Sequence, residues 1–252
     1  MNKLSIISLI LDNIRLEGVV MDRIEVLKDK IHSWGASIIG FADISKCIDE
    51  KYRDLPYAIS IAVRLSDRII DEIDNMPTYT YFHHYRTVNA LIDQITIRTG
   101  LLLQDWGYQY IAVPASQTVK DAAESYSGIF PHKTAAVLAG LGWIGKSGLL
   151  VTHDYGPRIR LGTILTDMPL PISSVSKDNS CKNCNLCSLA CPAMAIRGNE
   201  WELEKGREHI VDAHACSQYM KEKFQHIGRG SVCGVCIKVC PKGDKRKNKN
   251  IP

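Results

Sequence analysis

The chain has 252 residues, of which 45% are hydrophobic and 23% are charged. This composition is typical of a globular protein and excludes intrinsic disorder, collagen-like repeats and low-complexity scaffolds. Lys and Arg outnumber Asp and Glu by 31 to 27, an excess too small to indicate nucleic acid or an anionic membrane as an obligatory partner.

The most apolar stretch near the start of the chain runs from Leu4 to Leu11 and contains two serines. It is much shorter than the roughly 20 residues that a membrane-spanning helix needs. Charged residues follow at once and no small-residue cleavage site appears, so we expect no membrane partner, no secretory signal and a cytoplasmic location. In such a reducing compartment, clustered cysteines are more often metal ligands or redox groups than disulfides.

Helical and strand-like patterns alternate along the first part of the chain. Apolar residues at three- and four-residue spacing predict helices over 21–34 and 83–106, and β-branched or aromatic runs predict strands over 37–44, 57–65 and 108–113. We expect Cys47, in the polar loop between the first two strands, to be a buried small hydrophobic residue.

The same alternation continues toward a proline- and serine-rich segment. A short buried helix is expected over 134–141, followed by strands over 149–152 and 159–165. Together these elements predict an α+β fold. Residues 167–177 hold two prolines and three serines without helical or strand periodicity, which predicts a main domain over 1–170 and a cysteine-rich domain over 171–252.

Eight of the nine cysteines lie between Cys181 and Cys240, in two related motifs. The first is the C-x2-C-x2-C-x3-C-P run of bacterial two-cluster ferredoxins, whose fourth cysteine ligates the other cluster. The second repeats only the C-x2-C-x3-C-P ending, and Cys216 upstream supplies the missing ligand. The pattern predicts two [4Fe-4S] clusters, one held by Cys181, Cys184, Cys187 and Cys240 and the other by Cys191, Cys216, Cys233 and Cys236.

Structural zinc is the alternative, since paired C-x2-C elements also build all-cysteine zinc sites. Zinc requires neither the C-x2-C-x2-C triplet nor a proline after the last cysteine, so the motifs favour iron. Residues 181–252 carry 13 basic and 7 acidic side chains, an excess that eight thiolates would partly offset. Because such clusters move single electrons, we expect the preceding residues to hold a further cofactor or a substrate.

The segment AGLGWIGK (139–146) contains three glycines within six residues. Such glycines serve either the close approach of a flat cofactor or phosphate, or tight turns and close packing. By its letters alone, the segment matches two nucleotide-binding patterns, the Walker motif and G-x-G-x-x-G. A predicted helix precedes it and a predicted strand follows it, which is the reverse of the order that those motifs need, so we expect no nucleotide there.

Three stretches together carry a family resemblance: AGLGWIGK (139–146), YGPRIRLGTILTD (155–167) and the double cysteine motif. They resemble the epoxyqueuosine reductase family and its relatives, the reductive dehalogenases, with weaker similarity at GFADI (40–44) and HHYRTVNALI (83–92). The resemblance implies a nitroreductase-like α/β domain that holds base-off cobalamin, followed by a bacterial two-cluster ferredoxin-like domain. The cofactor-binding residues that it implies are Gly140, Leu141, Gly142, Trp143, Ile144, Gly145, Lys146 and Arg158.

The chain departs from this family pattern in two places. It stops just after the second cysteine motif, without the helical-repeat region that epoxyqueuosine reductases carry for tRNA. Tyr126 aligns where the tRNA-modifying enzymes have Asp, and the resemblance to reductive dehalogenases implies a tyrosine proton donor helped by a cation. The predicted catalytic residues are therefore Tyr126, Arg160 and Lys146, with Arg158 as another source of the cation.

His132 and Lys133 follow Tyr126 in the sequence. They either bind a substrate anion or only mark the start of the next helix, where a cation gains nothing from the helix dipole.

The expected function is that of an oxidoreductase in which two [4Fe-4S] clusters reduce a cobalamin that reduces a small organic substrate. An external low-potential donor such as a ferredoxin or flavodoxin would supply the electrons. One alternative is an epoxyqueuosine reductase acting on tRNA, with the basic residues near the end of the chain contacting phosphates. Another is a ferredoxin-type electron-transfer protein without an organic substrate.

Overall fold

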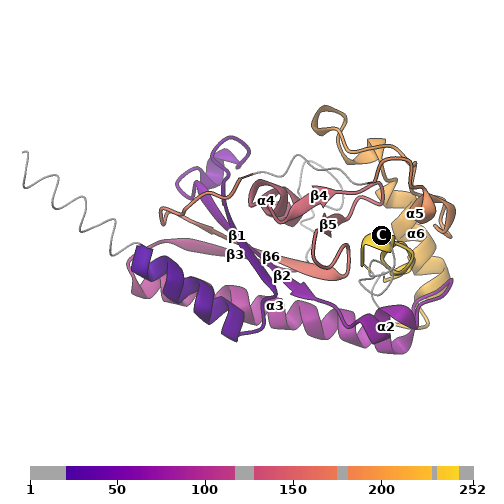
Figure 1. The fold of residues 1–252 in the computed structure, drawn as a ribbon, viewed down its shortest axis with the longest axis horizontal. Helices are drawn as coiled ribbons and strands as arrows, with labels where there is room; N and C mark the ends of the chain where they lie inside the picture. The colour runs from indigo at the N-terminus through magenta and orange to yellow at the C-terminus, as the bar shows by residue number, and fades with distance from the viewer. Residues whose placement is uncertain (1–20, 117–127, 175–180, 229–231, 244–252) are drawn as a thin grey trace, which may run out of the picture.

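The computed structural model describes residues 21–116, 128–174, 181–228 and 232–243, and it has mixed helix and strand structure (Figure 1). A four-stranded sheet forms its centre. The strands are β1 (Ile38–Asp43), β2 (Tyr57–Arg64), β6 (Ile159–Thr166) and β3 (Tyr110–Val113), in the spatial order β1-β2-β6-β3. All neighbouring pairs are antiparallel.

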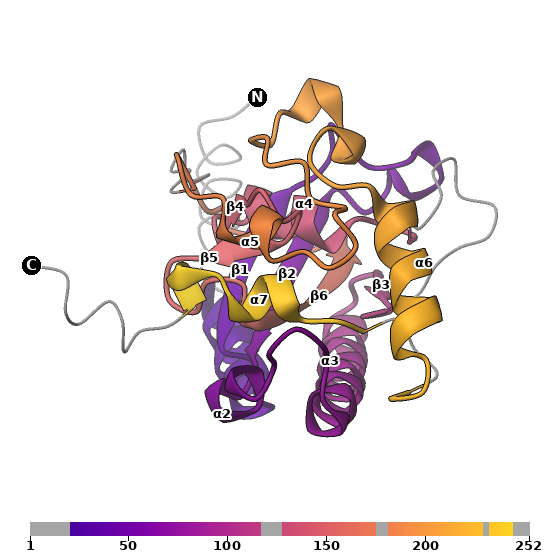
Figure 2. The ribbon, with the colours of Figure 1, turned by 90° about the vertical axis from the view of Figure 1, so that its right-hand side faces the viewer.

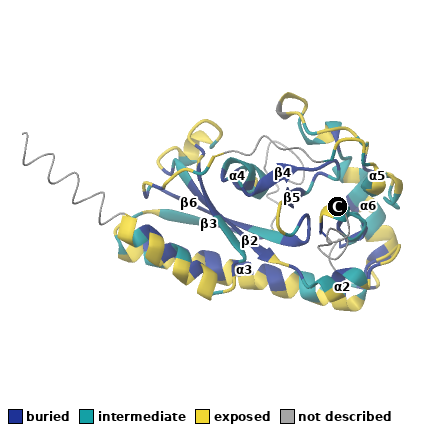
Figure 3. Cartoon of the chain, in the orientation of Figure 1, coloured by how far each residue is buried: buried dark blue, intermediate teal, exposed yellow. Residues whose placement is uncertain are grey.

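The central strand β2 is buried on both faces because its side chains alternate between two hydrophobic cores. Ile59 and Ile61 enter the core beneath the long helix, whereas Ala58 and Ala62 enter the core on the opposite face. Figure 3 shows buried parts of the sheet next to α3, whose outer face is exposed. Two-sided burial explains why the sequence of β2 is an almost continuous apolar run.

Different elements cover the two faces of the sheet (Figure 1). One face packs against residues 21–33, which are helical, and against α3 (Tyr79–Asp105). The other face packs against α4 (His132–Leu138), which is followed by the two-stranded sheet of β4 (Gly142–Ile144) and β5 (Leu150–Thr152).

Helix α3 begins earlier than the apolar spacing predicts, because its start is set by a cap. The Thr78 side chain accepts a hydrogen bond from the backbone N–H of Tyr81. This cap satisfies one of the N–H groups that a helix start leaves without a partner. The cap adds a turn that carries Tyr81 and Phe82, and Tyr81 becomes part of the site described below.

The cysteine-rich part lies at one end of the sheet (Figure 2). Its helices are α5 (Leu186–Leu189), α6 (Ala213–Phe224) and α7 (Val235–Lys238). Short 3-10 turns accompany them, namely η2 (Leu203–Lys205), η3 (Arg207–His209) and η4 (Pro241–Gly243). Val235 and Ile237 of α7 belong to the same buried core as α3, while the predicted boundary between residues 170 and 171 stays a prediction.

Two further elements lie in the first part of the chain. They are η1 (Glu50–Tyr52) and α2 (Asp67–Asp71), and α2 packs against both α3 and α7. Cys47 is exposed, so the expectation of a buried residue is wrong. Leu4–Leu11 lie outside the described residues, and no helix in the described part of the chain has the length and apolarity to cross a membrane.

Candidate functional site

One group of cysteines lines a pocket in the cysteine-rich part. Cys181, Cys184 and Cys187 come from the loop before α5 and from α5 itself, and Cys240 follows α7. Burial raises the pKa of Cys187, helped by the neighbouring Cys181 and Cys184. Burial also raises the pKa of Cys240 to about 11. The fold thus brings the predicted first set of four together.

The other four cysteines come from three separate segments, and all eight are partly buried. Burial raises the pKa of Cys216 to about 11, and the next contributions come from Cys191 and Cys233. Burial also raises the pKa of Cys236, with Cys233, Cys216 and Cys191 next in order. These four cysteines are the predicted second set, and Cys187 of the first set also acts on Cys236, so the two groups are neighbours.

The contact between α5 and α7 explains why the two sets interleave. These short helices pack against each other, and each carries a cysteine of one set while the cysteine before the following proline belongs to the other set. Among the described residues, no three or more His, Cys, Asp or Glu side chains converge on one point that could hold a single metal ion. A [4Fe-4S] cluster makes a different demand, since its four thiolates bind four different irons.

The glycine-rich segment packs closely against other segments of the chain and against the first cysteine group. A Cβ atom at Gly140 would lie 2.6 Å from the Ser174 carbonyl oxygen, and one at Gly142 would lie 2.1 Å from the Val151 carbonyl oxygen. A Cβ atom at Gly145 would lie 3.4 Å from Cys181 Sγ. The glycines therefore permit close packing within the protein, and their role toward cobalamin stays a prediction.

The remaining residues of this segment are also largely enclosed. Leu141, Trp143 and Ile144 are buried, the last two in β4. Lys146 is buried as well, lines the first cysteine pocket and donates from Nζ to Asn185 Oδ1 at 3.2 Å. Lys146 is thus placed beside the first cysteine group.

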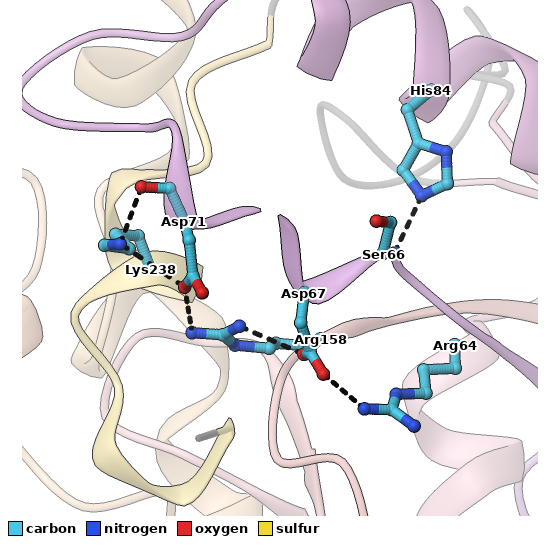
Figure 4. A network of polar contacts seen from close by, with 7 residues as sticks. All are labelled: Arg64, Ser66, Asp67, Asp71, His84, Arg158 and Lys238. Carbon is cyan, nitrogen blue, oxygen red and sulfur yellow. Dashed lines mark hydrogen bonds and ion pairs between the residues drawn. The ribbon is translucent and has the colours of Figure 1, made fainter. Parts of the chain in front are cut away.

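Arg158 is buried in a polar network that joins three elements (Figure 4). Its Nη1 and Nη2 lie 3.0 Å from carboxylate oxygens of Asp67 and Asp71, respectively, on α2. Lys238 of α7 donates to the Asp71 carbonyl oxygen at 2.9 Å, and its Nζ lies 3.3 Å from the Asp71 carboxylate. Through Asp71, Arg158 thus links the residue before β6 to α7, which carries Cys236, and its role toward a cofactor stays a prediction.

Arg160 contacts two residues of α3 that the sequence analysis did not single out. Its Nε donates to Asn89 Oδ1 at 2.8 Å and its Nη2 donates to the Tyr85 hydroxyl at 3.2 Å. The guanidinium carbon also lies 4.3 Å from the centre of the Tyr85 ring. Burial alone would raise the pKa of Tyr85, but the Arg160 charge and hydrogen bonds with Ser116, Asn89 and Arg160 outweigh it and hold this pKa below its ordinary value.

Tyr81 connects this tyrosine to the second cysteine group. The rings of Tyr81 and Tyr85 have centres 6.4 Å apart. A Cβ atom at Gly234, between Cys233 and Cys236, would lie 2.7 Å from the Tyr81 ring. Burial raises the pKa of Tyr81, and both of these cysteines also act on it. The Tyr85–Arg160 pair is therefore placed beside the second cysteine group.

Tyr126 lies outside the described residues. Burial lowers the pKa of His132, and both of its ring nitrogens have partners: Nδ1 lies 2.8 Å from Thr163 Oγ1 and Nε2 lies 3.0 Å from the Pro114 carbonyl oxygen. Lys133 donates to the Gly148 carbonyl oxygen at 2.6 Å, and burial lowers its pKa to about 8. Both side chains thus have partners within the fold.

One known protein family and several known proteins are similar to this chain. Residues 180–243 match the family described as the 4Fe-4S double cluster binding domain. The chain is 34% identical over 120 residues to the epoxyqueuosine reductase of Aliivibrio fischeri, an alignment that covers 44% of this chain and 30% of that protein. It is 32% identical over 132 residues to the tetrachloroethene reductive dehalogenase of Sulfurospirillum multivorans, covering 48% of this chain and 25% of that one.

The fold of this chain is also similar to that of a known reductase. A solved reductive dehalogenase, reported with a mechanism for B12-dependent dehalogenation, superposes with a TM-score of 0.69 at 19% identity, covering 87% of this chain and 31% of that one. At that identity the likeness concerns the fold. The alignments span less than a third of the length of these three proteins. The chain is thus a relative of the epoxyqueuosine reductases and reductive dehalogenases, and it carries their kind of 4Fe-4S double cluster binding domain in residues 180–243.

Proposed function

We propose that the chain is an iron-sulfur reductase that passes electrons through two [4Fe-4S] clusters to a bound cobalamin for the reduction of an organic substrate. The observation that carries this proposal is the gathering of eight thiols into two neighbouring groups, with a tyrosine–arginine pair beside the second cysteine group. The proposed ligands are Cys181, Cys184, Cys187 and Cys240 for one cluster and Cys191, Cys216, Cys233 and Cys236 for the other.

The donor sets fit these clusters, because a [4Fe-4S] centre takes four cysteine thiolates. Thiols bind iron only after losing their protons, so the burial that raises the pKa values of Cys216 and Cys240 makes cluster assembly release protons. The surplus of basic side chains in residues 181–252 offsets part of the resulting negative charge.

A cobalamin site in the main domain is supported by the likeness to a dehalogenase reported as B12-dependent. We propose a nitroreductase-like domain over 1–170, with residues 139–146 and Arg158 contributing to that site. The indole Nε1 of Trp143 is buried and has no hydrogen-bond partner among the described residues, so it is available to a bound group. When bound, cobalamin supplies a strongly reduced cobalt that donates electrons to the substrate.

We propose that a side chain of the protein supplies the proton for reduction of the substrate. Tyr85 is half-buried, its pKa is held down mainly by Arg160, and Asn89 fixes Arg160 from the other side. A tyrosine beside a cation is a better acid than a free one. We therefore propose Tyr85, beside the second cysteine group, as the proton donor. It takes the role that the sequence resemblance implies for Tyr126, which was expected to be helped by Arg160 and Lys146.

The test is anaerobic reconstitution of the full chain with iron, sulfide and cobalamin. We expect about eight irons per chain, corrinoid absorbance that remains with the protein through gel filtration, and reduction of one of two substrate classes. These classes are a chlorinated alkene and an epoxyqueuosine-containing tRNA stem loop, chosen because the relatives include both kinds of reductase.

Three results would contradict the proposal. Protein that returns zinc with negligible iron removes the clusters. Iron-loaded protein that retains no corrinoid leaves an electron-transfer protein, the ferredoxin-type alternative. Fully loaded protein that reduces neither substrate class under a low-potential reductant removes the reductase function for these classes.

A further inference from the structure

We propose that α5 and the turn after it form the docking surface for an acidic one-electron carrier protein, which reduces the first cluster. We call this surface the α5 face and define it by Leu186, Leu189 and Met194, with the exposed cations Lys182, Arg197 and Lys242. The inference rests on the proposed function insofar as it needs the first cluster. It adds the place where electrons enter and the kind of partner that brings them.

The α5 face is apolar where a surface is expected to be polar. Leu189 and Met194 are 83% and 89% exposed, and Leu186 is 49% exposed. Leu186 and Leu189 are three residues apart on one helix and so share a face. Met194 lies in the turn whose N–H donates to the Cys191 carbonyl oxygen, directly after α5. Grouped apolar side chains of this kind mark interaction sites more often than single exposed residues do.

The charged side chains of the two cysteine segments have one sign. Residues 181–199 and 232–243 contain four cations, Lys182, Arg197, Lys238 and Lys242, and no Asp or Glu. Lys238 is engaged with Asp71, whereas the other three are exposed. The next acidic residues along the chain include Asp178, Glu200 and Asp244. An apolar patch accompanied by exposed cations fits a partner with an acidic rim around an apolar centre.

The position of the α5 face fits electron entry. Leu186 and Lys242 line the same pocket as Cys181, Cys184, Cys187 and Cys240. In Figure 2, α5 and α7 lie on the face turned toward the viewer. The second cysteine group adjoins the first, since Cys187 acts on Cys236, and Cys236 in turn acts on Tyr81. A carrier bound on α5 would lose one electron, the first cluster would gain it, and the second group would stand between that cluster and the Tyr85–Arg160 pair.

The same observations disfavour two other occupants. Two copies of this chain related by a two-fold axis would place the α5 face against itself and bring Lys182, Arg197 and Lys242 toward their own copies. Nucleic acid is held mainly by phosphate contacts and polar side chains, which leaves three exposed aliphatic residues without a role. A protein with an acidic rim uses both the apolar centre and the surrounding charge.

The test compares reduction of the clusters by a protein and by a small molecule. Flavodoxin hydroquinone, an acidic one-electron carrier, and dithionite are each mixed with the reconstituted full chain in a stopped-flow instrument, and cluster absorbance and EPR signals are followed. In the Leu189→Glu variant we expect the second-order rate with flavodoxin to fall about tenfold and its Kd to rise, because a charge enters the apolar centre and repels the acidic partner. Reduction by dithionite is expected to be unchanged.

Two further variants sharpen the result. Lys182→Glu is expected to slow flavodoxin and to weaken the salt dependence of its rate, since it reverses a steering charge. Leu101→Glu is the matched control, because Leu101 is an exposed leucine of α3 remote from the cysteines. It is expected to leave both rates unchanged.

Several outcomes overturn the inference. Equal flavodoxin rates in wild type and Leu189→Glu, with clusters that dithionite reduces normally, overturn the docking surface and leave the proposed function intact. A dimer that Leu189→Glu dissociates assigns the face to a second copy, and loss of tRNA binding in this variant assigns it to nucleic acid. If dithionite reduces no cluster in the wild-type protein, the result contradicts the proposed function and, with it, the docking surface.

Discussion

Arg160 both donates a hydrogen bond to the Tyr85 hydroxyl, at 3.2 Å, and lies over the Tyr85 ring, with its guanidinium carbon 4.3 Å from the ring centre. The two contacts act differently. The hydrogen bond and the positive charge both favour the phenolate, while stacking on the ring fixes the position of the guanidinium. A tyrosine held in this way is a stronger acid than a solvent-exposed one, and it stands beside the second cysteine group.

Tyr85→Phe is expected to lower turnover by about 100-fold or more, the usual contribution of a general acid, without changing iron or corrinoid content. Tyr79→Phe is the control, since Tyr79 is an exposed tyrosine of the same helix. If Tyr85→Phe keeps full turnover while Tyr126→Phe loses it, the proton comes from Tyr126 and not from Tyr85.

The pH dependence of turnover is expected to change when Arg160 is replaced, because the Arg160 charge lowers the pKa of Tyr85. A proton donor works in its protonated form, so turnover falls as pH rises through the pKa of Tyr85. The charged groups acting on Tyr85 reduce to Arg160 among the described residues, with Ser116 and Asn89 contributing hydrogen bonds. Arg160→Gln should therefore raise the pKa of Tyr85 and move this fall to higher pH. Tyrosinate absorbance measured against pH checks the shift independently of turnover, and an unchanged titration would contradict it.

The sequence predicts most of the secondary structure, because apolar periodicity is a local signal. The helices over 21–33 and 79–105 and the strands β1, β2, β5 and β6 appear close to their expected places. Strand β4 was missed, since its three residues lie in a glycine-rich segment and become a strand only by pairing with β5. Cys47 was predicted buried, but its loop projects from the sheet and leaves it exposed.

The candidate site is less accessible to sequence analysis than the cysteines are. Cysteine spacing carries its own chemical meaning, so the two groups could be proposed from it directly. The contact of Tyr85 with Arg160 spans 75 positions of the chain and depends on the pairing of β6 with its neighbours. In the sequence, the stretch 83–92 stands out only for its family resemblance. Nothing local distinguishes Arg160, which faces α3, from Arg158, which faces α2.

Asp71→Asn is expected to destabilise the protein by about 3 kcal/mol, because it weakens a buried ion pair and leaves the Arg158 charge poorly compensated. This loss would lower the Tm of the reconstituted protein by about 6 °C or more in anaerobic circular dichroism. Loss of the carboxylate charge beside Lys238, which keeps its hydrogen bond to the Asp71 carbonyl oxygen, should also loosen α7, seen as faster release of iron to a chelator. Glu72→Gln is the control, since it removes the exposed pair with Arg68 while leaving an amide oxygen to accept from the Thr80 hydroxyl, and it should change the Tm little. Equal effects of the two variants would show that the network adds no stability.

Gly140→Ala separates packing from cofactor binding in the glycine-rich segment. Gly140 has φ of 72° and a Cβ atom there would lie 2.6 Å from the Ser174 carbonyl oxygen. Gly107 has φ of 89° and no atom within 4 Å of such a Cβ atom, so Gly107→Ala measures the backbone strain alone, about 1–2 kcal/mol. We expect Gly140→Ala to lower the Tm more than Gly107→Ala, with or without cobalamin. A difference between the variants that appears only with cobalamin bound would instead assign Gly140 to the cofactor.

Paired cysteine variants test how the eight ligands are shared. If Cys191 and Cys216 bind the same cluster, the double variant Cys191→Ala/Cys216→Ala should retain about four irons per chain, as each single variant does. The double variant Cys187→Ala/Cys191→Ala should lose almost all iron, because it removes one ligand from each cluster. Cys47→Ala should retain about eight irons, since Cys47 lies far outside both motifs. Iron analysis and EPR spectra of the reduced proteins distinguish these outcomes. If each motif instead bound its own cluster, the results for the two double variants would be exchanged, and the electron path from α5 to Tyr85 would need a different order of ligands.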